Sequence, residues 1–474
     1  MADFIMASHS KSAKVLGAQS LGSGPLSGRV RAPGDKSMSH RALILGAMAK
    51  GTTTVEGLLE GDDILSTAGA MRAFGAKITQ TRKGEWNITG RKAWDAKPAT
   101  DIDCGNAGTG VRLIMGAAAG YKTQARFTGD ASLSSRPMAR IINPVSLMGA
   151  GFQAENEDGS PKNGDRLPIS LTSDGRLKEI TYETPKASAQ IKSAVLLAGV
   201  NTQGKTVVIE KPSRDHTENM LRAFGCPVKV EAVGDGRNRI TIERDLNDPD
   251  SQLKATHIVI PGDPSSAAFA MVAALIVPGS DIVIENVMMN PTRTGLFETL
   301  VEMGGWLRAD NFRKFGGEVI ADIHVKHSRL RGVTVPVQRV ASMIDEYPVL
   351  TVAAAFASGK TVMDGLAELR VKESDRISAT VALLKDNGVT VEERESGMTV
   401  TGLGYRNGND YPSVKGGGHV ITHHDHRIAM SALILGLMSD NPVTIDDASM
   451  IATSFPEFFD QMQSLGAAQL VKAS

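Results

Sequence analysis

The sequence has little of several residue types, and each shortage excludes a class of protein. Cysteine occurs only at positions 104 and 226, too few for a disulfide framework and too widely spaced for a zinc site, which fits a reducing cytoplasm. Aromatic residues form 4% of the chain, and 52 basic residues balance 52 acidic ones, so we expect no nucleic-acid partner. The longest apolar run, 267–277, has eleven residues, whereas a membrane-spanning helix needs about 18, so we expect no membrane partner.

The rest of the composition is that of a globular protein with a large core. The chain has 474 residues, of which 41% are hydrophobic and 22% charged, and this length allows about two to four domains. The first twenty residues lack the apolar stretch of a secretory signal, so we interpret residues 1–25 as a leader that can be disordered.

A sixfold repeat organises the remaining sequence. Six segments rich in small apolar residues predict buried helices with a polar N-terminal edge, at residues 39–49, 108–120, 193–200, 266–277, 347–357 and 427–438. A β-branched run that predicts a strand follows each segment, and a more polar helix that ends at a glycine follows each strand. Those glycines are Gly75, Gly149, Gly225, Gly304, Gly388 and Gly466, at intervals of 74, 76, 79, 84 and 78 residues.

The repeats predict the architecture. Each unit is expected to be a small α/β sandwich with the order β–α–β–α–β–β, and three units that turn their apolar helices inward would form one lobe. Two related Pro-Gly-Asp turns, which begin at Pro33 and Pro261, predict the points where the chain passes between two lobes. The N-terminal lobe would then be 34–260, and the C-terminal lobe would be 26–33 plus 261–474.

The starts of the predicted buried helices are the places where we expect chemistry. The first N–H groups of a helix lack internal partners and form the positive end of its dipole, so several such ends around one cleft would attract anions. Charged or glycine-rich motifs stand at several predicted helix starts: KSMSHR, GNAGTG, IDEY and HHDHR before buried helices, and GDASLSSRP and KESDR before more polar ones. Taken singly, each is explained as well by a helix cap, a turn or a solvated charge. A metal site at His423, His424 and His426 is disfavoured because adjacent ligands do not converge easily, so no metal is expected.

Taken together, the motifs resemble those of the enolpyruvyl transferase family, and within it the EPSP synthase branch of bacterial class II type. The motifs stand in order between residues 26 and 470: PGDKSMSHR, GNAGTG, GDASLSSRP, SAQIKSA, SRDHTE, PGDPSS, IDEYP, LRVKESDR, HHDHRIAM and ATSFPEF. The resemblance implies a two-lobed α/β fold with three βαβαββ units in each lobe. It also implies transfer of the enolpyruvyl group of phosphoenolpyruvate to the 5-hydroxyl of shikimate 3-phosphate, with release of phosphate and without a cofactor, in the pathway to aromatic amino acids.

The resemblance also implies the role of each site residue. Asp345 or Lys36 would accept the hydroxyl proton, and Glu373 would deliver a proton to the methylene carbon and later remove it. The shikimate 3-phosphate site would be formed by Lys36, Ser37, Arg41, Ser188, Ala189, Gln190, Arg214, Asp345 and Lys372. The phosphoenolpyruvate site would be formed by Lys36, Asn106, Gly108, Arg136, Gln190, Glu373, Arg376 and Arg427. Two lobes on hinges would close around the first substrate.

Three positions bear on how far the resemblance extends. Ala189 stands where the enteric and plant pattern has a second serine, so only its backbone would contact the ligand. Thr453 stands where many relatives have a lysine, so one phosphate contact is expected to be missing or to come from elsewhere. Gly108 stands where some class II members carry an alanine that crowds the inhibitor glyphosate, so the glycine favours sensitivity.

Two alternatives stay open at this point. The sister UDP-N-acetylglucosamine enolpyruvyl transferases share the fold, but they usually carry a cysteine in the loop that corresponds to residues 128–137, where this chain has Asp130 and no cysteine. A non-catalytic anion-binding protein could use the same scaffold, although the complete set of charged residues favours an active enzyme. For the enzyme we expect a monomer in the cytoplasm.

Overall fold

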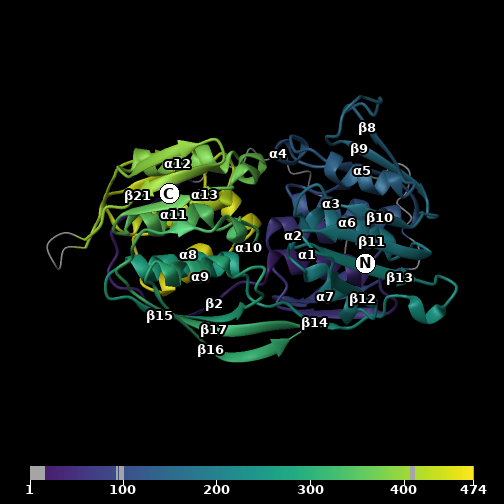
Figure 1. The fold of residues 1–474 in the computed structure, drawn as a ribbon, viewed down its shortest axis with the longest axis horizontal. Helices are drawn as coiled ribbons and strands as arrows, with labels where there is room; N and C mark the ends of the chain where they lie inside the picture. Colours follow the sequence, from purple (N-terminus) through teal and green to yellow (C-terminus); the bar gives the residue numbers. More distant parts are fainter. Residues whose placement is uncertain (1–16, 92–93, 95–100, 316, 406–410, 473–474) are drawn as a thin grey trace, which may run out of the picture.

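The computed structural model describes residues 17–91, 94, 101–315, 317–405 and 411–472. These residues form two bodies that lie side by side, each around a hydrophobic core of its own (Figure 1). One core takes its buried apolar side chains from residues 38–260 and Met288, and the other from residues 18–32 and 267–470. We call these bodies the N-terminal lobe and the C-terminal lobe; the residue limits that the sequence suggests for them stay a prediction.

Six apolar helices lie inside the lobes, where the sixfold repeat predicts them. They are α1 (Lys36–Met48), α3 (Gly108–Ala119), α6 (Ala189–Gly199), α8 (Pro264–Ile276), α11 (Tyr347–Ala355) and α13 (His426–Gly436). Most of their side chains are buried on every face, because small residues let neighbouring elements approach closely. Four of them begin after a side-chain cap, supplied by Asp35, Ser188, Asp263 and Asp425.

Six further helices end at the glycines that the sequence identifies as stops. They are α2 (Asp62–Ala73), α5 (Ala139–Leu147), α7 (His216–Ala223), α9 (Gly295–Glu302), α12 (Arg376–Asp386) and α14 (Phe458–Ser464). All six glycines have a φ between 83° and 114°, which a residue with a Cβ rarely adopts. The next residue donates its N–H back into the last turn, as Ala76 does to Met71 O at 3.1 Å. The predicted helix stops are therefore confirmed.

The remaining elements are short. The strands are β1 (Ala18–Ser20), β2 (Ser27–Arg31), β3 (Thr52–Glu56), β4 (Lys77–Arg82), β5 (Glu85–Thr89), β6 (Asp101–Asp103), β7 (Lys122–Thr128), β8 (Gly151–Ala154), β9 (Ile169–Asp174), β10 (Ile180–Glu183), β11 (Gly204–Glu210), β12 (Val228–Ala232), β13 (Asn238–Arg244), β14 (His257–Val259), β15 (Asp281–Met288), β16 (Trp306–Phe315), β17 (Glu318–Lys326), β18 (Thr334–Val335), β19 (Lys360–Met363), β20 (Thr390–Arg394), β21 (Gly397–Thr401), β22 (Val414–Gly416), β23 (His419–Val420), β24 (Ser439–Asn441), β25 (Val443–Ile445) and β26 (Val471–Lys472). Short helices are α4 (Ala131–Ser134), α10 (Val340–Met343), η1 (Pro249–Ser251), η2 (Val337–Arg339), η3 (Ala367–Val371) and η4 (Ser449–Thr453). In the part of the chain that the structure describes, no helix has the length and apolar character needed to cross a bilayer.

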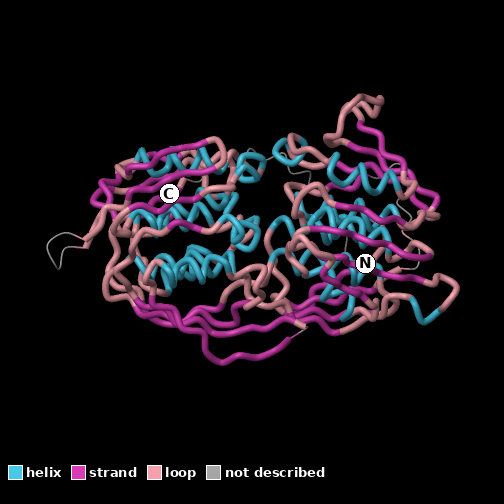
Figure 2. The backbone as a smooth tube through the Cα atoms, viewed as in Figure 1, coloured by secondary structure: helices cyan, strands magenta, loops and turns pink. Residues whose placement is uncertain are grey.

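Each unit contains a four-stranded sheet of the same topology. The first two strands are parallel, the third is antiparallel to the second, and the fourth is antiparallel to the third. The sheets have the orders β14–β3–β5–β4, β6–β7–β9–β8, β10–β11–β13–β12, β2–β15–β17–β16, β18–β19–β21–β20 and β23–β25–β1–β26. In each lobe the strands lie toward the outside, and helices lie between the sheets of that lobe (Figure 2). The predicted α/β fold of six repeated units is confirmed.

The chain passes between the lobes twice, and the two passages lie against each other. β2 pairs with β15 of the C-terminal lobe and leads into α1 of the N-terminal lobe, whereas β14 pairs with β3 and leads into α8 of the C-terminal lobe. At the Pro-Gly-Asp turns, Asp35 N donates to Pro261 O at 2.8 Å, and Asp263 N donates to Pro33 O at 2.7 Å. The two turns that the sequence singles out are therefore hydrogen-bonded partners.

Residues 18–20 differ from the predicted leader over residues 1–25. They form β1, in which Ala18 pairs with Ile445 of β25 and Gln19 pairs with Val471 of β26. Without β1, these two strands would leave backbone N–H and C=O groups unpaired between them. The leader interpretation is therefore wrong for these three residues, which complete the sixth sheet, while residues 1–16 lie outside the described part of the chain.

Arg293 holds the two passages together. Its guanidinium donates to Asp35 Oδ2 at 2.5 Å and to Asp263 Oδ1 at 2.8 Å, and all three side chains are buried. Burial alone would raise the pKa of Asp35, but Arg293 and His216 outweigh it and hold that pKa well below its ordinary value. The same two aspartates cap α1 and α8, so one arginine fixes both helix starts.

His216 of α7 extends this contact toward the other lobe. Its Nε2 accepts from Arg293 Nη1 at 3.4 Å, and its Nδ1 lies 3.2 Å from Glu318 Oε1 of β17. Asp215, His216 and Glu318 also have ligand atoms within 4.8 Å of one another, a spacing that suits a metal ion. His216 already contacts both Glu318 and the Arg293 cation, and Glu318 also accepts from Asn290, so we interpret the group as polar contacts between the lobes.

The crossing of α3 and α6 gives a first prediction. A Cβ at Gly116 would lie 2.6 Å from the Cα of Ala194, closer than two carbon atoms can pack. Gly116→Ala should therefore destabilise the fold by about 1–3 kcal/mol, seen as a lower urea midpoint. The control is Gly69→Ala in α2, where nothing lies within 4 Å of the added methyl, and it should be neutral or stabilise by about 0.5–1 kcal/mol. Equal effects of the two substitutions would contradict the close approach.

Buried His40 in α1 gives a second prediction. Burial, with help from Lys36 and Arg41, holds the pKa of His40 well below its ordinary value, so the folded protein keeps it neutral. The unfolded chain takes up a proton as the pH falls below about 6.5, and folding stability should therefore decrease by about 1.4 kcal/mol per pH unit from this group. The stability is fully present above this pH.

The measurement is the urea midpoint of His40→Asn between pH 5 and 7. Asparagine can keep the hydrogen bond that His40 Nδ1 shares with Thr67 Oγ1 at 2.8 Å, so the variant should fold and show a shallower dependence on pH. His257→Asn is the matched control, because exposed His257 makes the same type of contact with Thr54. An unchanged slope in His40→Asn would show that this histidine is protonated in the fold.

Candidate active site

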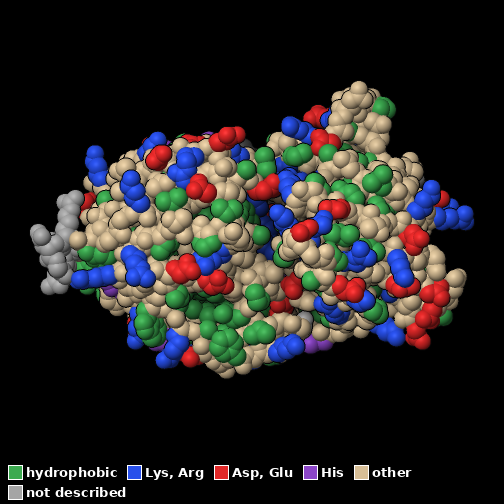
Figure 3. Space-filling model, viewed as in Figure 1, with side chains coloured by type: hydrophobic (Ala, Val, Ile, Leu, Met, Phe, Trp, Pro, Cys, Tyr) green, Lys and Arg blue, Asp and Glu red, His purple; other side chains and the backbone are tan. Residues whose placement is uncertain are grey.

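The surface is hollowed between the lobes, and basic side chains gather at the hollow (Figure 3). Helix starts from both lobes contribute to it. Predicted site residues occupy the first or second position of a helix at Lys36 and Ser37, Gly108, Ala189 and Gln190, Arg376, and Arg427. The repeat thus places polar residues where exposed N–H groups and the positive ends of helix dipoles already favour anions.

Helix α1 presents Lys36, Ser37 and Arg41. Lys36 Nζ pairs with Asp63 Oδ2 of α2 at 2.6 Å, a partner that the sequence did not identify. Arg41 is buried, and it donates to Ser37 O at 2.9 Å, Thr217 Oγ1 at 2.7 Å and Ser193 Oγ at 2.8 Å. Burial lowers the pKa of Arg41 to about 10, although Glu218 and Asp35 favour its charge. Arg41 thus stays charged, and three neutral oxygen atoms orient its guanidinium.

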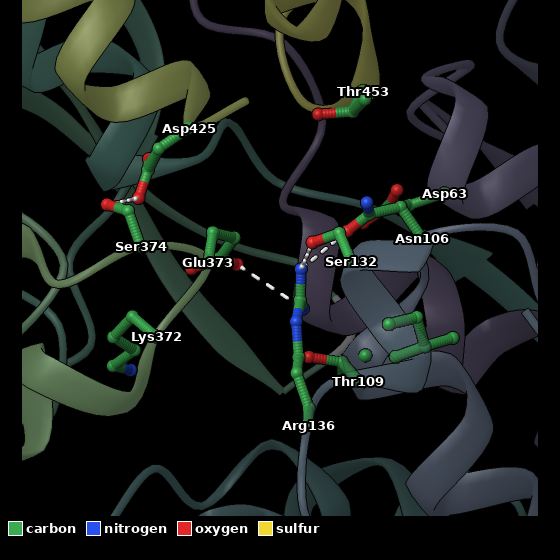
Figure 4. A network of polar contacts seen from close by, with 12 residues as sticks. Asp63, Asn106, Thr109, Ser132, Arg136, Lys372, Glu373, Ser374, Asp425 and Thr453 are labelled. Atoms are coloured by element: carbon green, nitrogen blue, oxygen red, sulfur yellow. Dashed lines mark hydrogen bonds and ion pairs between the residues drawn. The ribbon is translucent and has the colours of Figure 1, made fainter. Parts of the chain in front are cut away.

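The start of α3 holds Arg136 in a network. Arg136 Nη2 donates to Asn106 Oδ1 at 2.6 Å and to Ser132 Oγ at 3.0 Å (Figure 4). Gly108 lies against the same guanidinium, since a Cβ at that position would be 2.7 Å from Arg136 Nη1. Helix α3 has no side-chain cap, and its first N–H, that of Gly108, donates to the backbone O of Asn106 at 2.7 Å. Gly108 thus leaves the space that the Arg136 guanidinium occupies at the helix start, and a larger residue would displace the guanidinium.

The start of α6 is built from Ser188, Ala189 and Gln190. Ser188 Oγ accepts from Ile191 N at 3.4 Å and caps the helix. Gln190 reaches α3, where its Nε2 donates to Thr109 Oγ1 at 3.1 Å and its Oε1 accepts from Arg112 Nη1 at 3.3 Å. Arg112 is nearly buried, and the sequence did not identify it either. It orients the Gln190 amide from behind.

Asp345 lies where cations of both lobes meet. Its Oδ2 accepts from Arg214 Nη2 of the N-terminal lobe at 2.7 Å, and its Oδ1 accepts from Arg376 Nη1 at 3.1 Å and Lys372 Nζ at 3.3 Å. Burial would raise the pKa of Asp345, but these cations and Arg427 hold it well below its ordinary value. Without an anionic ligand, Asp345 is a charged carboxylate and a weak base.

Glu373 faces Arg136 across the cleft. Arg376 Nη2 donates to Glu373 Oε2 at 2.6 Å. Arg136 Nη1 of the other lobe lies 3.9 Å from Glu373 Oε1, a contact that Figure 4 shows. Burial would raise the pKa of Glu373, but the cations Arg376, Arg136 and Lys372 together hold it well below its ordinary value. Arg376 in turn donates through Nε to Asp425 Oδ2 at 2.8 Å, and both of these side chains are buried.

Arg427 is less constrained than the other site arginines. Its Nη1 lies 3.8 Å from Glu346 Oε1, a longer contact than any hydrogen bond of Arg376. Its neighbour His426 is buried, and burial together with Lys36 and Arg427 lowers the pKa of His426 to about 3. Arg427 is thus a cation held by one long ion pair, which an anionic ligand could replace.

Two sequence predictions meet local structure that limits them. His423 and His424 have left-handed φ values of 52° and 56° and are exposed, whereas His426 is buried in α13, so the three histidines lie in different surroundings. Thr453 Oγ1 donates to Met450 O at 2.7 Å, so this hydroxyl is used within η4. Thr453 therefore brings no charge to the position where relatives carry a lysine.

The structure joins most of the predicted residues into one charged group. Ion pairs connect Arg136 and Arg214 of the N-terminal lobe with Asp345, Lys372, Glu373 and Arg376 of the C-terminal lobe. Asn106 and Gly108 lie against Arg136, while Lys36 and Arg427 have partners of their own in Asp63 and Glu346. In the described residues, Ser188 and Ala189 make no direct contact with Asp345 or Glu373. The sequence missed Asp63, Arg112 and Asp425, although Asp425 stands inside a motif that it quoted. A cluster of this kind can gather polyanions from water and hold two carboxylates ready to exchange protons.

Comparisons with known proteins support a common origin for this site. The family model for EPSP synthase (3-phosphoshikimate 1-carboxyvinyltransferase) matches residues 21–462. A protein of Caulobacter vibrioides named 3-phosphoshikimate 1-carboxyvinyltransferase is 55% identical over 453 residues, which is 95% of this chain and 98% of the relative. A protein of the same name from Parvibaculum lavamentivorans is 53% identical over 453 residues, which is 95% of this chain and 96% of the relative.

Solved structures agree with the sequence relatives. EPSP synthase from Acinetobacter baumannii superposes with a TM-score of 0.83 and 44% identity, over 97% of this chain and all of that chain. The enolpyruvyl transferase NikO from Streptomyces tendae gives a TM-score of 0.72 over 97% of this chain and 99% of its own, and at 18% identity it shows the fold alone. On the family match and the near full-length relatives, this chain belongs to the EPSP synthase (3-phosphoshikimate 1-carboxyvinyltransferase) family.

Proposed function

We propose that this enzyme transfers the enolpyruvyl group of phosphoenolpyruvate to the 5-hydroxyl of shikimate 3-phosphate and releases phosphate. The observation that carries the proposal is the meeting of Arg136 and Arg214 from one lobe with Glu373 and Asp345 from the other. Two phosphorylated substrates repel each other, and this repulsion must be offset before their reacting atoms can touch. Arginine suits this task because its planar guanidinium matches carboxylate and phosphate oxygens.

Shikimate 3-phosphate would bind to the floor of the N-terminal lobe. Ser37 and the helix start at Ala189 supply short polar groups there, and Arg41 and Arg214 supply charge beneath them. Ser188, Gln190, Lys36 and Lys372 would complete the site around the phosphate and the ring. Asp345 would face the 5-hydroxyl, because it is the carboxylate that already reaches Arg214 across the cleft.

Phosphoenolpyruvate would bind between Arg136 and the cations of the C-terminal lobe. Arg376 and Arg427 would take its carboxylate, while Lys36, Arg136 and Gln190 would hold its phosphate over Asn106 and Gly108. Lys36 and Arg136 are now paired with Asp63 and Glu373, so the incoming anion would compete with those carboxylates. The 3.9 Å pair of Arg136 with Glu373 is weaker than the 2.6 Å pair of Lys36 with Asp63, so an incoming anion should displace it more easily.

The substrates would themselves adjust the proton affinity of the two carboxylates. Cations hold the pKa values of Asp345 and Glu373 well below the ordinary value while the site is free of ligand. Bound phosphates and a carboxylate neutralise those cations, so both pKa values should rise toward a range that allows proton transfer. Asp345 could then accept the hydroxyl proton, with Lys36 as the other candidate base, and Glu373 could protonate the methylene carbon and later remove a proton.

One chain suffices for this reaction, because both lobes of the same chain supply the site. We therefore include in the proposal a monomer as the working unit, with shikimate 3-phosphate and phosphoenolpyruvate as its partners. A cytoplasmic location stays a prediction. Closure of the lobes around the first substrate would exclude water, which would otherwise compete for the activated phosphoenolpyruvate.

Replacement of Glu373 gives the most direct test of the proposed reaction. Glu373→Gln keeps the shape of the side chain but cannot exchange a proton, so kcat should fall by about 10²- to 10⁴-fold. The assay is phosphate release from the two substrates together. Glu392→Gln on the exposed face of β20 is the control and should keep wild-type activity. Full activity in Glu373→Gln, with an unchanged melting temperature, would remove this residue from the reaction.

Substitution of Gly108 tests the phosphoenolpyruvate site. Gly108→Ala would push a methyl toward Arg136 Nη1, so the KM for phosphoenolpyruvate should rise while the KM for shikimate 3-phosphate stays within about twofold. Glyphosate should inhibit the wild-type enzyme and lose potency against Gly108→Ala. A wild-type inhibition curve that stays flat into the millimolar range would contradict the link between this glycine and sensitivity. Equal rises in both KM values would place the glycine outside the phosphoenolpyruvate site.

A further inference from the structure

The segment that carries Lys372 and Glu373 is held at its ends. It runs from η3 to the first residue of α12, and between them Lys372 has a backbone ψ of −149°, which is not helical. At one end Arg376 is fixed by Asp425 in the interior of the C-terminal lobe. Leu369, in η3, is buried in the same lobe. The place of Glu373 in the cleft therefore depends on how η3 is docked.

Glu368 of η3 docks on the other lobe. It forms a direct ion pair with Lys186 of the loop between β10 and α6, and its Oε2 lies 3.7 Å from Arg140 Nη1 of α5. Burial alone would raise the pKa of Glu368, but Lys186, Arg140 and Lys372 hold it below its ordinary value. Two glutamates of one segment thus pair with two arginines of the other lobe: Glu368 with Arg140, and Glu373 with Arg136.

The Glu368 contact differs from the other contacts between the lobes at the site. Arg214, Asp345, Arg136 and Glu373 are groups that the proposed substrates would engage, so their contacts must rearrange when ligands bind. Lys186 and Arg140 have no place among the proposed substrate contacts. The pair with Glu368 can therefore persist while substrates occupy the cleft.

We propose that Glu368 is a positioning residue that latches the Lys372–Glu373 segment onto Lys186 and Arg140 of the opposite lobe when the lobes are together. The inference rests on the proposed function for its kinetic part, and on the contacts alone for its structural part. Glu368 and Lys186 side chains are 40% and 41% exposed, so salt should weaken the latch and its effect should be modest.

The kinetic test is a double-mutant cycle. Glu368→Gln and Lys186→Gln should each lower kcat/KM for both substrates by about two- to fivefold at low ionic strength. The double variant should match Glu368→Gln, because the same contact is lost only once. Glu393→Gln is the matched control: it removes a carboxylate that anchors Arg370 of the same segment at 3.0 Å but within one lobe, and it should lie near wild type. Multiplying losses in the double variant, or equal losses in Glu393→Gln, would overturn the latch.

X-ray scattering of the enzyme without ligand and with shikimate 3-phosphate alone, which cannot react, tests the latch apart from the reaction. At low salt, Glu368→Gln should have a larger radius of gyration than the wild type, and in about 1 M KCl the two should coincide, because salt at that level screens the pair. Equal radii at low salt, both with and without shikimate 3-phosphate, would refute the latch. A wild-type enzyme that releases no phosphate from the two substrates would instead refute the proposed function, and the scattering comparison would still decide for or against Glu368.

Discussion

A single buried arginine sets the geometry from which the site follows. Arg293 contacts Asp35 at 2.5 Å and Asp263 at 2.8 Å, and each of these aspartates ends one passage between the lobes and caps the helix that comes next. Loss of one partner from such a buried pair typically destabilises a protein by about 3–5 kcal/mol, because the other charge is left uncompensated. The triad therefore fixes where α1 and α8 begin and which way they enter the two lobes.

The position of α1 determines where the charges of the N-terminal lobe lie in the cleft. Its first residue is Lys36, and Arg41 follows little more than one turn later, so a fixed helix start fixes both charges. The C-terminal lobe brings Asp345, Glu373 and Arg376 to the same space on elements of its own repeats. Zero net charge over the chain is compatible with this arrangement, because carboxylates of the site already balance its cations. Anionic substrates would replace these carboxylates as the partners of the cations. This exchange requires less reorganisation than the creation of a cationic pocket without counter-charges.

Local sequence patterns were enough to predict the repeated elements. The six buried helices, the strands after them and the glycine stops depend on neighbouring residues, so periodicity and turn chemistry reveal them. Strand β1 could not be predicted in this way, because its three residues carry no strand pattern and pair with residues more than 400 positions away. Arg293 was missed for the same reason: one arginine in a short loop has partners 258 and 30 residues away.

The site residues also divide into those that local motifs reveal and those that depend on contacts between distant segments. Motifs at helix starts identified Lys36, Arg136, Glu373 and Arg376, because each motif is local, and family resemblance supplied their expected roles. Asp63 and Arg112 were missed because each acts by contact with a residue from another element. The low pKa values of Asp345 and Glu373 could not be read from the sequence either, since they arise from cations on separate helices and loops of both lobes.

The central claim is that substrate anions replace carboxylates as the partners of the cleft cations. The most direct measurement is a crystal structure of the enzyme with shikimate 3-phosphate and glyphosate bound. We expect ligand oxygens within hydrogen-bond distance of Lys36, Arg136, Arg376 and Arg427, with the present Arg136–Glu373 and Lys36–Asp63 pairs lengthened or broken. Ligands bound outside this group of residues, or bound within it while both ion pairs stay as they are, would contradict the account.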